Sequence, residues 1–169
     1  MICVICGSNQ AEPPKRGSRR EDISCKSCSA RRRDQDQAQA ILGLVSDGSA
    51  GTLSAMVEAA LTADRDLRIL EVALAGPFIA VLERLPGYVQ GYRWPGGGTG
   101  PQAAGVRYCD LEAIPFADES FDLVITSEVL PFVEREAVAH KEIRRVLKLG
   151  GAHVASLSMD WPAPAIPSS

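Results

Sequence analysis

Two short cysteine motifs near the N-terminus constrain the fold of this 169-residue chain more than any other feature. Cys3 and Cys6 form one C-x2-C hook, and Cys25 and Cys28 form a second hook after 18 intervening residues. Doubled hooks at this spacing are typical of a four-cysteine zinc site, in which four thiolates surround Zn²⁺ as a tetrahedron. Four protein ligands leave no open position on the metal, so we expect a structural zinc ion in a small ribbon.

Disulfide bonds are the main alternative for these cysteines. The chain begins MICVICGSNQ, which lacks the basic and then apolar layout of a secretory signal, and it has no apolar run of about 18 residues. We therefore expect a cytoplasmic protein without a membrane span, and a reducing compartment disfavours disulfides. A redox-active motif is also disfavoured, because both hooks lie in a turn-rich stretch and not between a strand and a helix.

Charge divides the chain at about the same place. Residues 1–33 carry eight basic and three acidic residues, a net charge of +5, whereas the remainder has a net charge of −8. We expect a zinc ribbon at 1–33 and a larger unit at 34–169. A basic ribbon can bind nucleic acid, but no aromatic residue precedes Phe78 to stack on bases. The charge pattern therefore favours a solvated surface, or one that docks on the acidic remainder, over a nucleic-acid interface.

The larger unit alternates predicted strands and helices. The predicted strands are 67–72, 88–90, 106–109, 121–127 and 152–157. The predicted helices are one from 34 that ends at Gly43 or in the turn 46–48, and three more at 53–63, 77–85 and 134–148, the last closed by Gly150-Gly151. This alternation is typical of an α/β fold with a parallel sheet and helices on both faces. Such sheets bind ligands at the carboxyl ends of their strands, which are 71–76, 91–94, 110–111 and 127–128.

Two segments carry a family resemblance. CDLEAIPFADESFDLVITSEVL (109–130) and HKEIRRVLKLGGAHV (140–154) resemble the class I S-adenosylmethionine-dependent methyltransferases. The resemblance covers residues 67–157, and the chain with its ribbon is similar to a bacterial subgroup of zinc-ribbon methyltransferase-like proteins. It implies a Rossmann-like, mostly parallel sheet of five strands, with S-adenosylmethionine as cofactor and a small molecule as methyl acceptor.

The resemblance also implies roles for individual residues at the strand ends. Asp110 and the backbone amide of Leu111 would face the adenine of the cofactor. Ser127 and Glu128 would border its methionine moiety and the acceptor. The remaining cofactor contacts would come from Glu71, Ala73, Gly76 and Tyr92. From the residues alone, a turn cap is the alternative role for Asp110.

Three departures from the family pattern concern the cofactor and the chemistry. Residues 71–77 read EVALAGP, with one glycine where the family has up to three and with the bulky Leu74 among them. Tyr92 or Arg93 stands where an acid normally holds the ribose. Pro131-Phe132 replace a frequent Glu-His pair, so no catalytic base can be assigned. The subgroup has variant loops with a Gly-Pro pair, such as Gly76-Pro77 here, so cofactor binding remains open.

A fourth departure concerns the sheet edge. The family fold ends with an antiparallel hairpin, and about a dozen residues after Leu157 are too few to form it. We expect an open edge that a second copy or a partner protein covers. Two functions remain open: a methyltransferase acting on an unidentified small molecule, or a non-catalytic relative that serves as a zinc-containing partner or adaptor subunit.

Overall fold

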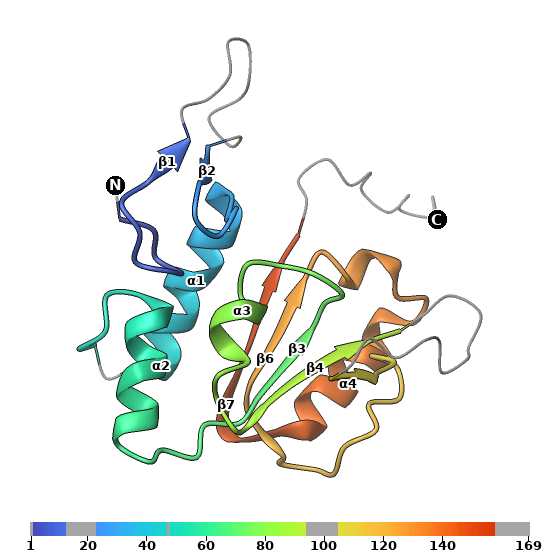
Figure 1. Ribbon diagram of the computed structural model, residues 1–169. Helices are drawn as coiled ribbons and strands as arrows, with labels where there is room; N and C mark the ends of the chain where they lie inside the picture. The colour runs from blue at the N-terminus through green and yellow to red at the C-terminus, as the bar shows by residue number, and fades with distance from the viewer. Residues whose placement is uncertain (1, 13–22, 47, 94–104, 158–169) are drawn as a thin grey trace.

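The computed structural model describes residues 2–12, 23–46, 48–93 and 105–157 (Figure 1). The strands are β1 (Ala11–Glu12), β2 (Ser24–Cys25), β3 (Ile69–Val72), β4 (Tyr88–Tyr92), β5 (Val106–Tyr108), β6 (Phe121–Ser127) and β7 (Leu147–Ser156). The helices are α1 (Arg32–Val45), α2 (Leu53–Thr62), α3 (Ile79–Leu82), the 3₁₀ turn η2 (Leu130–Phe132) and α4 (Glu136–Val146). None of these helices combines the length and apolarity of a membrane-spanning segment.

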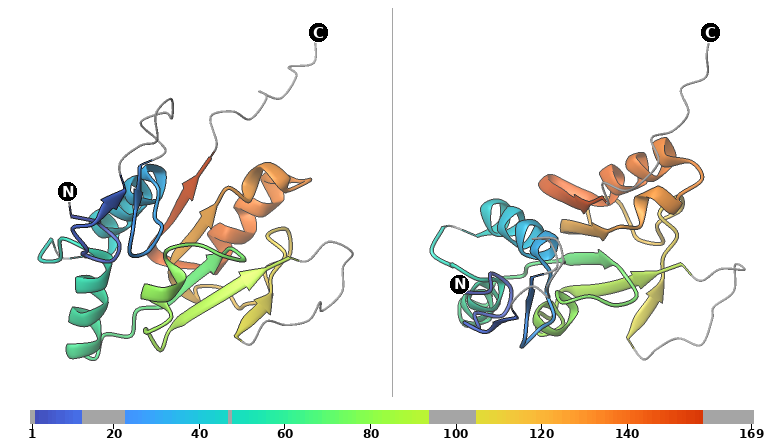
Figure 2. Two further views of the ribbon diagram at one scale, coloured as in Figure 1. Left: turned by 45° about the horizontal axis from the view of Figure 1, so that its top comes forward. Right: turned by 90° about the horizontal axis from the view of Figure 1, so that it is seen from above.

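Five strands form a parallel sheet in the order β5-β4-β3-β6-β7. The strand order reverses between β3 and β6, which is where sheets of this class place their ligands. Figure 2 shows α1, α2 and α3 on one face and α4 on the other. All four residues of β3 are buried, as expected for a strand covered on both faces. The predicted Rossmann-like α/β fold is therefore confirmed.

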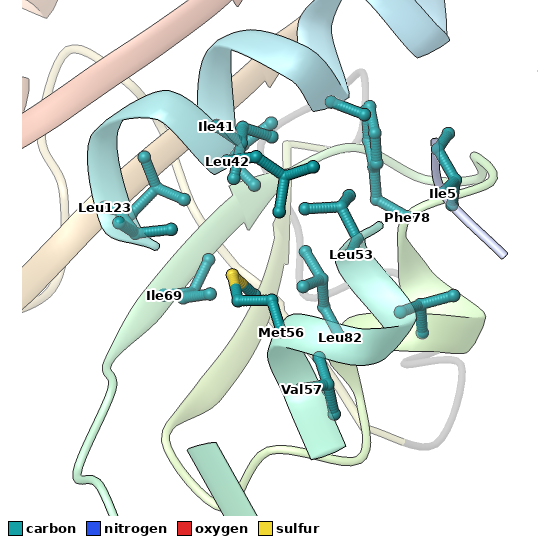
Figure 3. Packing of buried hydrophobic residues seen from close by; sticks show 14 of the residues in the cluster. Ile5, Ile41, Leu42, Leu53, Met56, Val57, Ile69, Phe78, Leu82 and Leu123 are labelled. Carbon is teal, nitrogen blue, oxygen red and sulfur yellow. The ribbon is translucent and has the colours of Figure 1, made fainter. Parts of the chain in front are cut away.

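The larger core lies between the sheet and the three helices of the first face (Figure 3). In α1, Ala38, Ile41, Leu42 and Val45 recur at helical spacing and are all buried, so they form one apolar stripe. Leu53 and Met56 of α2 pack into the same cluster, together with Ile69 and Leu123 from the sheet. Each fully buried leucine or isoleucine contributes about 1.5–3 kcal/mol, so this layer fixes where α1 and α2 lie.

The cysteine hooks share this core. Ile5 is completely buried within the cluster. The carbonyl oxygens of Val4 and Ile5 accept hydrogen bonds from the backbone amides of Leu53 (2.8 Å) and Ser54 (2.9 Å). The first amides of a helix have no partner within the helix, so the first hook caps α2. The ribbon is thereby held by apolar and backbone contacts with the rest of the chain.

The largest differences from the predicted element boundaries concern α3 and β7. Of the two predicted ends of the first helix, the turn at 46–48 is confirmed and Gly43 is not, because α1 continues to Val45 and Ser46 is its C-cap. The third predicted helix is the single turn α3. The strand predicted from 152 begins at Leu147, directly after α4, because Leu147 pairs with Phe121 across the sheet. Gly150-Gly151 therefore do not close a helix but lie within β7, where Gly150 takes the left-handed φ of 80° and the pairing register with β6 shifts.

Substitution of Gly91 in β4 would test how closely the strands and their side chains pack. A Cβ at this position would lie 2.7 Å from the Cβ of Cys109, so Gly91→Ala must displace a neighbour. We expect it to lower the free energy of unfolding by about 1–3 kcal/mol in urea denaturation. The control is Gly43→Ala on α1, where a Cβ would meet nothing within 4 Å. That variant should be more stable by up to about 1 kcal/mol, and equal effects of the two would contradict the packing described.

Candidate metal centre and ligand site

The four predicted metal ligands meet at one point. The Sγ atoms of Cys3 and Cys28 are 3.6 Å apart, those of Cys6 and Cys25 are 3.7 Å apart, and all four lie within 4.8 Å of one another. Zn–S bonds of about 2.3 Å give a tetrahedron with edges of about 3.8 Å. The four thiols thus fit a zinc ion, as the sequence predicted, with Cys3 and Cys25 buried.

The two hooks have the same backbone geometry. The amide of Gly7 donates to the carbonyl of Cys3 (2.9 Å), and the amide of Ser29 donates to the carbonyl of Cys25 (2.8 Å). Both donors have left-handed φ values, 78° for Gly7 and 60° for Ser29. This conformation disfavours a residue with a Cβ by about 1–2 kcal/mol, so the second hook holds a strained serine where the first has glycine.

The residues predicted for the ligand site lie at the carboxyl ends of β3 to β6. Asp110 follows β5, and its side chain is 22% exposed. Its Oδ1 accepts from the amide of Glu112 at 2.9 Å, and its Oδ2 lies 3.2 Å from Nε of Arg93. The turn-cap role foreseen for Asp110 is therefore present. Each carboxylate oxygen can accept a further hydrogen bond, so the group also suits the exocyclic amine of adenine.

Glu71 is a fully buried acid at the floor of this site. Its Oε2 accepts from the hydroxyl of Tyr88 at 2.8 Å, while its Oε1 is buried without a partner among the described residues. A Cβ built at Gly76 would lie 3.7 Å from Oε1, so this oxygen faces the loop after β3. Burial raises the pKa of Glu71 to about 7, and the bond from Tyr88 opposes that rise. The unpartnered oxygen suits a ligand that donates a hydrogen bond from the side of the loop.

Gln90 of β4 holds the loop that follows β3, a contact that sequence reasoning missed. Its Nε2 donates to the carbonyls of Ala73 (2.8 Å) and Leu74 (3.1 Å). The side chain of Leu74 is half exposed, so it is not buried in the core. Tyr92 ends β4 beside the site and is partly buried. A polar residue on an inner strand is the signal that could have identified Gln90.

Two residues of α1, Gln37 and Arg33, contact the end of β6. Neither contact was predicted from the sequence. Gln37 is buried, and its Nε2 donates to the carbonyls of Thr126 and Val154 at 3.3 Å each. Its Oε1 accepts from the hydroxyl of Ser127 at 3.1 Å. Arg33, one turn earlier on α1, pairs with Glu128. The missed signal is a glutamine four residues before the core residue Ile41, on the apolar side of the helix.

The side chain of Leu111, the residue after Asp110, is buried in the second core. Other features lie away from this chemistry. Cys109 is buried apart from the four hook cysteines, and its burial raises the pKa of its thiol to about 12. A cavity of about 580 Å³ lies at the opposite, amino ends of the strands, lined among others by Arg68, Tyr88 and Arg107. The polar residues predicted for the ligand site lie at the other, carboxyl ends of the strands.

Part of the chain is similar to known proteins. Residues 96–155 match the family model described as "Methyltransferase domain". The chain is 42% identical over 67 residues to the ubiquinone/menaquinone biosynthesis C-methyltransferase UbiE of Xanthomonas campestris pv. campestris, over 36% of this chain and 26% of that protein. It is 51% identical over 60 residues to UbiE of Xanthomonas oryzae pv. oryzae, over 33% of this chain and 24% of the relative. The chain thus spans about a quarter of the length of these relatives.

Several solved structures are also similar to part of this chain. An S-adenosylmethionine-dependent methyltransferase from Mesorhizobium loti has a TM-score of 0.41 and 22% identity, with coverage of 54% of this chain and 46% of that one. The trans-methyltransferase CalH in complex with SAH has a TM-score of 0.40 and 20% identity, over 73% of this chain and 46% of that one. The predicted resemblance to methyltransferases is thus confirmed for residues 96–155.

Ser29 provides a test of the metal centre. Ser29→Gly should relieve the strained backbone and raise the free energy of unfolding of the zinc-loaded protein by up to about 1–2 kcal/mol. Ser29→Val should lower it, because a β-branched side chain fits the left-handed conformation worst. Denaturation of both variants, with metal content measured alongside, checks this order. A Ser29→Gly protein less stable than wild type would contradict the hook geometry.

Glu71 predicts a pH dependence with a definite sign. Its folded pKa of about 7 lies above its ordinary value of 4.5, so the folded state binds the proton more tightly. The associated stability is fully present below pH 4.5 and is lost as the pH rises through 7. Relative to Glu71→Gln, the free energy of unfolding of wild type should fall by about 3 kcal/mol across that window. Urea denaturation at pH 4.5, 6 and 8 checks it, and a constant difference would contradict it.

Proposed function

We propose that this chain binds S-adenosylmethionine at the carboxyl ends of β3 to β6 and transfers its methyl group to a small-molecule acceptor. The observation that carries the proposal is that Glu71, Asp110 and Ser127 all lie at or just after the carboxyl ends of strands in one parallel sheet, in β3, after β5 and in β6. The methyltransferase-domain match covers two of these three residues.

The residues present suit the parts of such a cofactor. Asp110 accepts from the adenine amine, with the Leu111 amide donating to the ring. The Oε1 atom of Glu71, which has no partner among the described residues and faces the loop at 73–76, accepts a hydrogen bond from the cofactor. Tyr92 or Arg93 stands in the place of the usual ribose acid, and Arg93 pairs with Asp110, so it orients that carboxylate.

The chemistry demands little of the protein beyond alignment. When bound, S-adenosylmethionine supplies a methyl group on a positively charged sulfur. The chain's task is to orient the acceptor in line with that group and to exclude water. Ser127 and Glu128 border the acceptor side. The carboxylate of Glu128 is paired with Arg33, so we assign it no catalytic proton transfer, and the acceptor must be nucleophilic by itself.

The zinc ion and the sheet edge complete the proposal. Zn²⁺ on the four hook cysteines is structural, since it leaves no ligand position open, and thiol ligands suit a reducing, cytoplasmic setting. Within the described residues β7 is an edge strand of the sheet. A second copy of the chain or a partner protein that pairs with this edge would cover it.

Calorimetric titration with S-adenosylhomocysteine tests the function. Wild type should bind it, and Asp110→Ala should weaken binding by about tenfold, because a charge-assisted hydrogen bond is lost. The matched control is Asp36→Ala, which removes an aspartate that pairs with Arg32 on the surface of α1. Absence of binding to the zinc-loaded wild type would contradict the proposal and favour the non-catalytic adaptor.

A further inference from the structure

Helix α1 carries a two-residue contact to the ligand edge of the sheet, formed by Arg33 and Gln37 and named here the α1 clamp. We propose that the α1 clamp positions Ser127 and Glu128 for the homocysteine end of the cofactor, so that Gln37 acts as a positioning residue. This inference rests on the proposed function, and it adds a role to residues that lie about 90 positions away in sequence from those they hold.

Gln37 uses its whole amide group. Its two N–H groups satisfy the carbonyls of Thr126 and Val154 on the adjacent strands β6 and β7, and its carbonyl receives the Ser127 hydroxyl. Only 5% of the residue is exposed. A buried polar group is costly unless fully bonded, and here each hydrogen bond of the buried amide serves the ends of two strands. The arrangement fixes the orientation of the Ser127 side chain.

Glu128 explains why the strand end needs support. It takes a left-handed φ of 56° although it has a Cβ, a conformation disfavoured by about 1–2 kcal/mol. Two contacts hold it there: its amide donates to the carbonyl of Ser156 at 3.0 Å, and its carboxylate pairs with Arg33. Strained residues that their surroundings over-determine occur preferentially at binding sites. The clamp thus secures a turn that its own sequence would not favour.

The clamp is also tied to the metal hooks. Arg33 follows Cys28 by five residues. Between them Ala30 is fully buried, and its carbonyl accepts from the amide of Cys25 at 2.9 Å. The start of α1 is thereby anchored at the second hook, which gives the clamp a fixed support on the side away from the sheet.

Two probes separate positioning from general stability. S-adenosylhomocysteine reaches both ends of the proposed site, whereas adenosine reaches only the Asp110 end. In calorimetric titrations of the zinc-loaded protein, Gln37→Ala should weaken binding of S-adenosylhomocysteine by about tenfold and change adenosine binding by less than about twofold. The matched control is Gln39→Ala, which changes an exposed glutamine on the same helix and should alter neither affinity.

Arg33→Ala keeps the inference testable if Gln37→Ala does not fold, because the Arg33 side chain is 44% exposed. This variant should weaken the binding of S-adenosylhomocysteine about threefold and leave adenosine binding unchanged. The control is Arg32→Ala, which removes an arginine that pairs with Asp36 and should change neither affinity. Equal weakening of both probes, or no change in either, overturns the positioning role. A wild type that binds adenosine and S-adenosylhomocysteine keeps the proposed function whatever the variants do. A wild type that binds neither overturns both.

Discussion

The closure of two distant cysteine hooks around one point is the constraint on which the rest of this structure depends. It brings residues 3–6 and 25–28 together, with sulfur pairs at 3.6 and 3.7 Å. The first hook then caps α2, and the second hook sets the start of α1. Because these helices cover one face of the sheet, the cysteine cluster helps to fix where the apolar stripe of α1 meets β6 and β7. The ribbon differs from the rest of the chain in charge but is part of the main core.

Helix α1 also links the cysteine cluster to the carboxyl-end edge of the sheet, where we propose that the ligand binds. Ile41 and Leu42 anchor α1 in the core, while Gln37 and Arg33, a turn and two turns nearer its N-terminus, reach the ends of the strands. Helix α1 therefore contributes both to the core and to the geometry of the strand ends. A change that moved α1 along its axis would disturb both the core and the Ser127-Glu128 turn.

The sequence predicted those parts of the fold whose signals are local. The apolar run 121–127 and the doubled hooks were recognisable because period, composition and spacing lie within a few residues. The start of β7 was missed because Leu147 is held in a strand by pairing with Phe121, a tertiary contact that outweighs the helical pattern before it. Gln37 was missed for a related reason: its partners lie 89 and more residues away. For Asp110 the sequence left a turn cap and a ligand contact open, because a carboxylate after a strand suits both, and the structure shows the cap.

The proposed function depends on cofactor binding at the carboxyl ends of the strands. Backbone amide chemical shifts, followed by NMR as S-adenosylhomocysteine is added, would test this most directly. We predict changes concentrated at 73–76, 110–111 and 127–128, at the carboxyl ends of β3, β5 and β6. Changes confined to the cavity at the opposite ends, around Arg68 and Arg107, or no changes at saturating ligand, would contradict it.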